Sequence, residues 1–159
     1  MKFIVQQDIL CRKKGDRVYM RPVIPTMLNG IFLLMKKKVI IQNEVNQNND
    51  IFPADFYAFR YAEKTDGTKP GAKFEITFQL KNMSAEKNEK FSLLPMLFVV
   101  GCKGFYSKYW LVNAETNTCR GIYQWDSLEN AIAYSKSFAV KFMSMRSVKG
   151  SIEYHVSEI

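Results

Sequence analysis

Apolar and polar residues alternate with a period of two along short segments in the second half of the chain. The clearest case is residues 74–80, where Phe74, Ile76 and Phe78 are separated by polar residues. A period of two places neighbouring side chains on opposite faces of a strand, so the pattern predicts a strand with one buried face. Residues 105–112, residues 121–125 and a last segment after Gly150 are predicted to be strands as well.

Helical periods separate these strands in two places. Ser84 is a suitable N-cap for a helix running towards Gly101, and Pro95 predicts a kink or the start of a second half, because its ring removes a backbone donor. Asp126 and Glu129 predict a capping box for another helix. The residues expected to face inward are Phe91, Leu94, Leu97 and Phe98 in the first helix, and Leu128, Ala131, Ile132, Phe138 and Phe142 in the second.

The resulting order is strand, helix, strand, strand, helix, strand, with a turn at residues 113–117 that makes the middle strands an antiparallel hairpin. This order predicts an α+β fold, the ferredoxin-like β-α-β-β-α-β unit. Such a unit has helices on one face of its sheet. Because the aromatic-rich strand 105–110 does not look polar on either side, we expect the open face to pack against a second copy of the chain.

The first half of the chain has weaker periods. Residues 2–10 and 17–24 predict a hairpin around Gly15, residues 26–35 a short helix, and residues 39–45 a further strand. Residues 43–50 predict a polar loop, and residues 53–63 a short helix opened by Pro53. Residues 65–71 give the strongest loop signal. We therefore divide the chain there, into an N-terminal extension (1–71) and a ferredoxin-like domain (72–159).

Three motifs in the second half resemble those of the dimeric α/β-barrel proteins. They are Gly-Phe-Tyr-Ser-Lys-Tyr-Trp at 104–110, Gly-Ile-Tyr-Gln-Trp-Asp-Ser at 121–127, and the segment 131–134 that ends in Tyr134. The likeness is greatest to the YdhR-like monooxygenases, although Arg120 stands where that family has the first glycine of a pair. Nothing before about Ile51 matches.

The resemblance implies a homodimer whose sheets face each other, with small-molecule pockets between each sheet and its helices. The wider superfamily includes cofactor-independent oxygenases, haem-degrading enzymes and binding modules, so the fold alone does not decide the function. A haem-degrading enzyme would need a histidine on the second helix, and none is present there.

The composition narrows the choice of partners. The net charge of +8 is spread over both halves, and the runs Arg12-Lys13-Lys14 and Lys36-Lys37-Lys38 predict a solvated surface, with an anion or phosphate patch as the alternative. Basic and aromatic residues do interleave around Lys108, as on platforms for single-stranded nucleic acid. The resemblance packs such aromatics into the dimer, so we expect no nucleic-acid partner.

Cysteine usage and hydropathy predict a cytoplasmic protein without a membrane partner. Cys11, Cys102 and Cys119 are odd in number and widely spaced, which is typical of reduced thiols. The apolar stretch 31–35 is too short to cross a bilayer, and the first residues do not fit a signal peptide. Because His155 is the only histidine, a site with several histidine ligands is excluded, and we predict neither a metal nor another cofactor.

The candidate chemistry lies on the predicted strands. We predict His155 and Tyr109 as catalytic residues acting as acid or base in an aromatic cleft; the alternative for His155 is a solvent-facing position on the last strand. The predicted substrate-binding residues are Trp110, Trp125, Tyr123, Asn82 and Lys108. For the aromatic residues the alternative is packing in the core or the dimer interface, and for the polar ones a surface or capping role.

These features predict a protein that binds a small aromatic or apolar molecule. Cofactor-independent monooxygenase activity on an aromatic or quinol-like substrate is the enzymatic hypothesis, since it requires little beyond an apolar cavity and a group that removes a proton. A non-catalytic ligand-binding or structural module of the same fold is the alternative.

Overall fold

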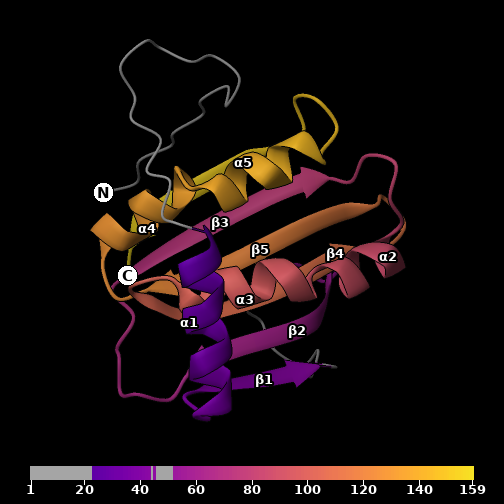
Figure 1. The fold of residues 1–159 in the computed structure, drawn as a ribbon. Coiled ribbons are helices and arrows are strands. Elements are labelled where there is room, and N and C mark those ends of the chain that lie inside the picture. Colours follow the sequence, from indigo (N-terminus) through magenta and orange to yellow (C-terminus); the bar gives the residue numbers. More distant parts are fainter. Residues whose placement is uncertain (1–22, 44, 46–51) are drawn as a thin grey trace.

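A computed structural model describes residues 23–43, 45 and 52–159 (Figure 1). The hairpin predicted for residues 2–10 and 17–24 and most of the loop predicted for residues 43–50 lie outside the described residues. Val23 and Ile24, the last residues of that predicted hairpin, belong to helix α1 (Val23–Met35), which confirms the helix expected from Thr26 onward.

The described strands form a single antiparallel sheet. Its strand order is β1-β2-β4-β5-β3-β6, and every neighbouring pair is antiparallel. The strands are β1 (Val39–Asn43), β2 (Tyr57–Lys64), β3 (Ala72–Gln79), β4 (Phe105–Asn113), β5 (Thr118–Trp125) and β6 (Glu153–Glu158).

The predicted ferredoxin-like unit is confirmed by strands β3 to β6. Helices α2 (Ala85–Phe91) and α3 (Leu93–Gly101) connect β3 to β4, and α4 (Leu128–Ser135) and α5 (Phe138–Met145) connect β5 to β6. Each connection skips one strand, which gives the order β4-β5-β3-β6 of a split β-α-β unit. Strands β1 and β2 extend this sheet beyond β4. One sheet therefore contains strands from both sides of the predicted domain boundary at residues 65–71.

Strand β2 replaces the helix that the sequence predicted for residues 53–63. A turn closes at Pro53, whose carbonyl accepts the backbone N–H of Phe56, and the chain then pairs with β4. The helix prediction was wrong because Pro53 and the spacing of the aromatics are weak local signals. Tyr57, Phe59 and Tyr61 favour a strand once a partner strand is available.

Both predicted helical connections are broken into two helices. The Ser84 hydroxyl accepts the backbone N–H of Lys87, as predicted, and the break at Ser92 places Pro95 in the first turn of α3, where proline is tolerated. The predicted capping box placed the N-cap at Asp126, one residue too early. Ser127 is the N-cap of α4, and the Asp126 carboxylate accepts the side-chain amide of Asn130 at 2.8 Å instead.

The described helices lie on one face of the sheet, and the main core lies between them and the strands (Figure 1). Its largest fully buried side chains are aromatic, among them Trp125, Tyr123, Phe74 and Phe105. Two residues predicted to face inward do not: Leu94 is 56% exposed and Ile132 is 39% exposed. Both lie on the outer side of helices whose opposite side already fills the core.

The open face of the sheet is only partly apolar, although the sequence suggested a largely apolar surface there. A small apolar cluster of Ala58, Leu111 and Ile122 is packed against Phe52 and Phe56. Tyr61 and Tyr109 pack against this cluster on the same face. Strands β3 and β5 add the ion-paired residues Lys73, Glu75 and Arg120. The dimer stays a prediction. Phe105 and Trp110 of the strand that suggested it are buried beneath the chain's own helices, whereas Tyr109 lies on the open face.

Helix α1 crosses α3 at a pair of glycines (Figure 1). A Cβ at Gly30 would lie 2.0 Å from the carbonyl oxygen of Leu97, and a Cβ at Gly101 would lie 1.9 Å from that of Thr26. The two backbones are thus in direct contact, and Asn29 donates a side-chain hydrogen bond of 2.8 Å to the Gly101 carbonyl. The contact fixes the distance between α1 and α3.

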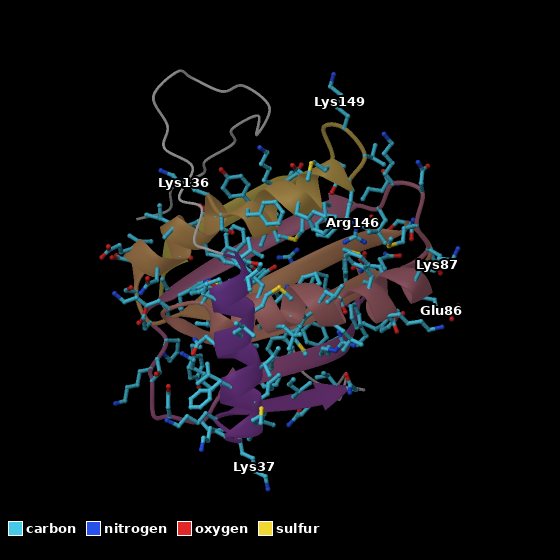
Figure 2. All side chains as sticks on the ribbon, viewed as in Figure 1. Lys37, Glu86, Lys87, Lys136, Arg146 and Lys149 are labelled. Carbon is cyan, nitrogen blue, oxygen red and sulfur yellow. The ribbon has the colours of Figure 1, made fainter. Side chains whose placement is uncertain are left out.

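Lysines at the ends of elements project away from the body of the molecule, as Figure 2 shows for Lys37, Lys87, Lys136 and Lys149. This arrangement agrees with a solvated basic surface at these positions. No helix in the described part of the chain is both long and apolar enough to span a membrane.

Candidate functional site

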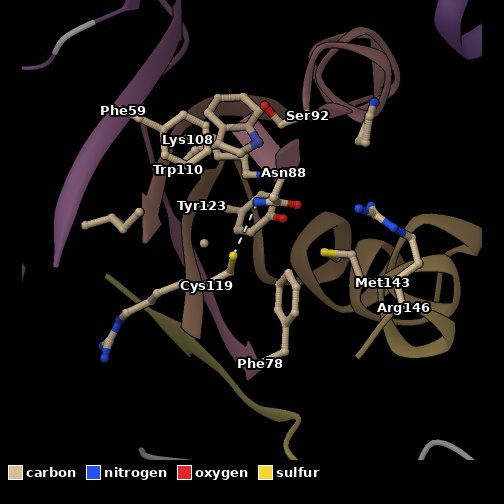
Figure 3. A pocket seen from close by; sticks show the side chains of 14 residues that line it. Phe59, Phe78, Asn88, Ser92, Lys108, Trp110, Cys119, Tyr123, Met143 and Arg146 are labelled. Carbon is tan, nitrogen blue, oxygen red and sulfur yellow. Dashed lines mark hydrogen bonds between the residues drawn. The ribbon is translucent and has the colours of Figure 1, made fainter. Parts of the chain in front are cut away.

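A small cleft lies between the sheet and the helices, where α2 meets α3 and α5 ends (Figure 3). The volume of the cleft is about 50 Å³. Lys108 and Trp110 lie near Phe59 on one side in Figure 3, and Met143 and Arg146 lie on the other. The walls are mainly apolar and aromatic, and their polar side chains come from α2, β4 and β5 and from the residues that follow α2 and α5.

Lys108 is the most unusual residue of this cleft. It is only 4% exposed, and its ammonium nitrogen lies 4.1 Å from the ring centroid of Trp110 and 4.2 Å from that of Tyr123. Among the described residues, no carboxylate forms an ion pair with it. A buried lysine is almost always paired with a carboxylate. Burial of Lys108 without such a partner therefore lowers the stability of the fold.

The geometry of β4 and β5 explains why Lys108 points inward. An irregularity in β4 between Phe105 and Ser107 shifts the alternation, so that Lys108 pairs with Tyr123 and Trp110 pairs with Gly121 on the helix-covered face. Gly121 leaves room for the Tyr123 ring, since a Cβ there would lie 2.6 Å from a ring carbon. The ring can therefore lie close to both Trp110 and the lysine.

Burial lowers the pKa of Lys108 well below the ordinary value for lysine, and the nearby positive charge of Arg60 lowers the pKa further. The two aromatic rings act in the opposite direction, because their faces attract a cation by about 2 kcal/mol when desolvated. Desolvation of an ammonium costs several kcal/mol even after relaxation of the protein, so it outweighs the rings. The neutral amine is thus favoured more strongly here than at a surface lysine.

Arg60 is a second buried cation beside the cleft. A bulge in β2 between Ala58 and Arg60 turns the guanidinium towards the helices, and the residue is 7% exposed. It donates to the Asn43 side chain at 3.1 Å, to the Ser92 hydroxyl and to the Glu89 carbonyl. Because these acceptors are neutral groups, they orient the guanidinium without cancelling its charge.

Arg146 closes the opposite side of the cleft. It follows α5, and its guanidinium carbon lies 3.8 Å from the ring centroid of Phe91. Burial lowers its pKa, and a guanidinium still stays charged at any physiological pH. None of the ion pairs among the described residues includes Arg146. Arg146 therefore lines the cleft with a positive charge, and Arg60 adds a second one beside it.

Cys119 lies between these two sides and is not a nucleophile in this state. The Asn88 side chain donates a hydrogen bond of 3.3 Å to its sulfur (Figure 3). Burial raises the pKa of the thiol to about 12, so it remains protonated at neutral pH. The thiolate, which is the reactive form of cysteine, is therefore absent.

Tyr123 also connects the cleft to a buried aromatic cluster. Its hydroxyl accepts a hydrogen bond of 3.5 Å from the hydroxyl of Tyr134, and the Trp125 ring lies 4.8 Å from that of Tyr134. Burial raises the pKa of both tyrosines, so both stay neutral phenols. The cluster fixes the ring that lies beside Lys108.

The sequence-predicted site residues are divided between the two faces of the sheet. Lys108, Trp110 and Tyr123 come together in the cleft, whereas Trp125 is fully buried in the aromatic cluster behind it. Tyr109 lies on the open face, where its ring centroid is 4.3 Å from that of Tyr61.

The other two predicted residues lie away from the cleft. His155 is opposite Glu75 on the open face, in the register of β3 and β6. Asn82 is exposed in the turn after β3, where its φ of 55° is the left-handed conformation that asparagine tolerates.

Several residues of the cleft were missed by the sequence analysis. Arg60 was hidden by the wrong helix prediction; in a strand, a basic residue between Ala58 and Ala62 would have indicated an unusual buried charge. Asn88 lies in the middle of α2 and Arg146 directly after α5, and only the tertiary structure brings these two positions to the sheet. No local signal marks them.

Comparisons with known proteins add little to this geometry. No family model and no curated protein matches the chain, so membership of the YdhR-like family stays a prediction. One solved structure of similar fold is that of an anthrone oxidase-like protein. It shares 16% identity over 61% of this chain, with a TM-score of 0.41, and the match spans 47% of that protein's length.

Proposed function

We propose that the cleft binds a small, flat, weakly acidic organic molecule such as a phenol or an enol, and that its enzymatic form is cofactor-independent oxygenation. The observation that carries the proposal is the buried amine of Lys108, enclosed by Trp110 and Tyr123 and without a carboxylate partner among the described residues. An acidic ligand would supply the missing negative charge.

The walls of the cleft suit such a ligand. The rings of Phe59, Trp110 and Tyr123 provide flat apolar surface, and Arg146 adds a positive charge on the opposite side. Apolar pockets with a few convergent polar groups are the usual form of small-molecule sites. The volume of about 50 Å³ limits the ligand to a small molecule.

In the oxygenase form, the neutral amine of Lys108 is the base. It takes a proton from an activated methylene group of the substrate, which the keto form of an enol supplies, and the ammonium that results stabilises the carbanion beside it. The carbanion then reduces dioxygen and a carbon–oxygen bond forms. Loss of water leaves a carbonyl group, so that one CH₂ and one O₂ become one C=O and one H₂O, and Lys108 returns its proton to the departing hydroxide.

A non-catalytic binding module is the second candidate function. The small room of the cleft favours it, because a substrate and dioxygen must both fit for the reaction above. In that case the same contacts would hold an anion and no turnover would follow.

Dioxygen consumption separates these possibilities. The full-length protein would be assayed with small phenols, quinols and activated ketones in an oxygen electrode, next to Lys108→Met and the surface control Lys149→Met. We expect uptake that Lys108→Met lowers at least about 100-fold, the usual contribution of a general base, and that Lys149→Met leaves unchanged. Equal uptake by wild type and Lys108→Met would reject the assignment.

Ligand binding is tested in the same proteins by quenching of tryptophan fluorescence. Trp110 lies in the cleft and Trp125 behind it, so Trp125→Phe isolates the signal of the cleft. Quenching by a phenol without dioxygen uptake would favour the binding module. If neither quenching nor dioxygen uptake is observed, both forms of the proposal are rejected.

The proposal includes a homodimer, as the resemblance to dimeric α/β-barrel proteins implies. Its support is the open face of the sheet, over which no described helix lies. Light scattering across a dilution series would give twice the chain mass if this is right. A stable single chain at every concentration would contradict it.

A further inference from the structure

We propose that Lys108 is a covalent binding site for a small aldehyde or ketone, which its amine captures as an imine. The inference rests on the proposed function only in that the cleft binds small molecules. It does not depend on dioxygen chemistry.

The geometry gives the amine the surroundings that imine formation needs. Lys108 lies within β4 between two paired strands, so its backbone is held on both sides. Its nitrogen lies against the faces of Trp110 and Tyr123 and borders the cleft. Because no described carboxylate pairs with it, the amine is not held in its charged form by a counter-ion.

The charged and titratable groups around the amine also favour its neutral form. Arg60 on β2 adds positive charge, and Arg146 is a further cation of the cleft. Cys119 and Tyr123 on β5 stay protonated, and Glu89 on α2 lies beside Arg60. Arg120 on β5 also lines the cleft, and its guanidinium forms an ion pair with Glu75. Lysines that become nucleophiles are commonly desolvated or placed beside another cation, and Lys108 is both.

The step balances without any further reagent. The amine nitrogen attacks the carbonyl carbon, a carbon–nitrogen bond forms, and the carbonyl oxygen becomes a hydroxyl group. This oxygen leaves as water with the two hydrogens of the amine, and a carbon–nitrogen double bond remains. The product is a neutral, flat imine; when it takes a proton from solvent water, the resulting cation lies against the faces of the two rings, which stabilise it.

The size of the cleft selects the class of carbonyl compound. Room of about 50 Å³ accepts a chain of a few carbon atoms more readily than a ring system. The water that the reaction releases is small enough to leave through the same opening. A short aliphatic aldehyde is therefore the appropriate probe.

The test uses wild-type full-length protein, propanal and cyanoborohydride at pH 7, followed by peptide mass mapping. Reduction of the imine leaves a propyl group on the lysine that formed it. We expect the Lys108 peptide to be labelled at least about tenfold faster than that of exposed Lys149, since each unit by which the pKa falls gives about tenfold more neutral amine. Labelling of Lys108 that is no faster than that of Lys149 would overturn the proposal.

The pH dependence provides a second readout without any variant. The Lys149 peptide serves as the reference, since the labelling rate of a fully solvated lysine rises about tenfold per unit between pH 7 and pH 9. The rate for Lys108 should rise much less, and the difference should vanish in urea. A parallel rise of the two rates in the folded protein would contradict the proposal.

Two variants separate this inference from the proposed function. Lys108→Met should lose the preferred adduct, and Lys149→Met should keep it. An adduct without dioxygen uptake leaves the imine site intact and rejects the oxygenase. Phenol binding or dioxygen uptake without an adduct rejects the imine site alone.

Discussion

Basic residues differ in solvation and in pairing between the two faces of the sheet. On the open face, Glu75 accepts from Lys73 at 3.2 Å and from Arg120 at 3.1 Å, and all three side chains remain partly in solvent. On the covered face, Lys108 is buried against two aromatic rings and has no carboxylate among the described residues as a partner. Both arrangements occur on neighbouring strands of one sheet.

The difference indicates on which face of the sheet a ligand site should be sought. A paired, partly solvated cation costs the fold almost nothing. A desolvated, unpaired amine is destabilising, and a protein retains it where a ligand or a reaction uses it. The cleft is therefore the better candidate site, although the sequence offered His155 and Tyr109 on the other face.

The largest expected effect is on the covered face of β3. Phe74→Ala should lower the free energy of unfolding by about 3–5 kcal/mol, because the ring is fully buried among Tyr123, Tyr134 and Tyr154. Thr77→Ala, on the open face of the same strand, should change it by only about 0.5 kcal/mol. Urea denaturation measures both, and equal losses would mean that the two faces are not distinct.

The next effect concerns the cost of the buried amine. Lys108→Met should raise the free energy of unfolding by about 1–4 kcal/mol, since it replaces a desolvated polar group by an apolar one of similar length. The matched change on the open face, Lys73→Met, should lower it by no more than about 1 kcal/mol. If Lys108→Met destabilised the protein instead, the lysine would be a structural element of the core.

The pH dependence of stability should sharpen the same contrast. Because the folded-state pKa of Lys108 is lowered, the unfolded chain binds one more proton than the folded one at every pH between the folded and the unfolded pKa. Stability should therefore rise with pH in this window, by up to about 1.4 kcal/mol per unit, and level off above the unfolded pKa of about 10.4.

This slope is measured as the difference between wild type and Lys108→Met in urea denaturation from pH 7 to pH 9.5. The upper limit avoids the titration of the tyrosines, whose buried members have raised pKa values. A difference that stays constant with pH would show that Lys108 titrates as an ordinary lysine does.

The smallest expected effect is on the open-face ion pairs. Glu75→Gln should lower the free energy of unfolding by only about 0.2–1 kcal/mol, because its two partners remain partly solvated. Added salt should shrink this difference further. A loss of several kcal/mol would mean that the open face is covered in solution, as it would be in the predicted dimer.

The ferredoxin-like unit could be predicted from the sequence because its strands have strong local signals. Phe74, Ile76 and Phe78 alternate with polar residues, and Ser84 caps its helix as expected. Strand β2 could not be predicted in this way, because Tyr57 and Phe59 become strand residues only through pairing with β4. Long-range pairing of this kind leaves little trace in a single sequence.

The candidate site was predictable only in part, for a related reason. Lys108, Trp110 and Tyr123 are on strongly patterned strands, so their neighbourhood could be inferred. Which face they share depends on the irregularity after Phe105, which inverts the simple alternation. The cations that complete the site, Arg60 and Arg146, come from elements whose positions only the folded chain defines.

The contact between Gly30 and Gly101 has a consequence for recognising other chains of this design. A side chain at either position would collide with a backbone carbonyl, so the two sites can vary only if the helices separate. Chains that share this helix crossing should therefore keep the two glycines together, as a linked pair.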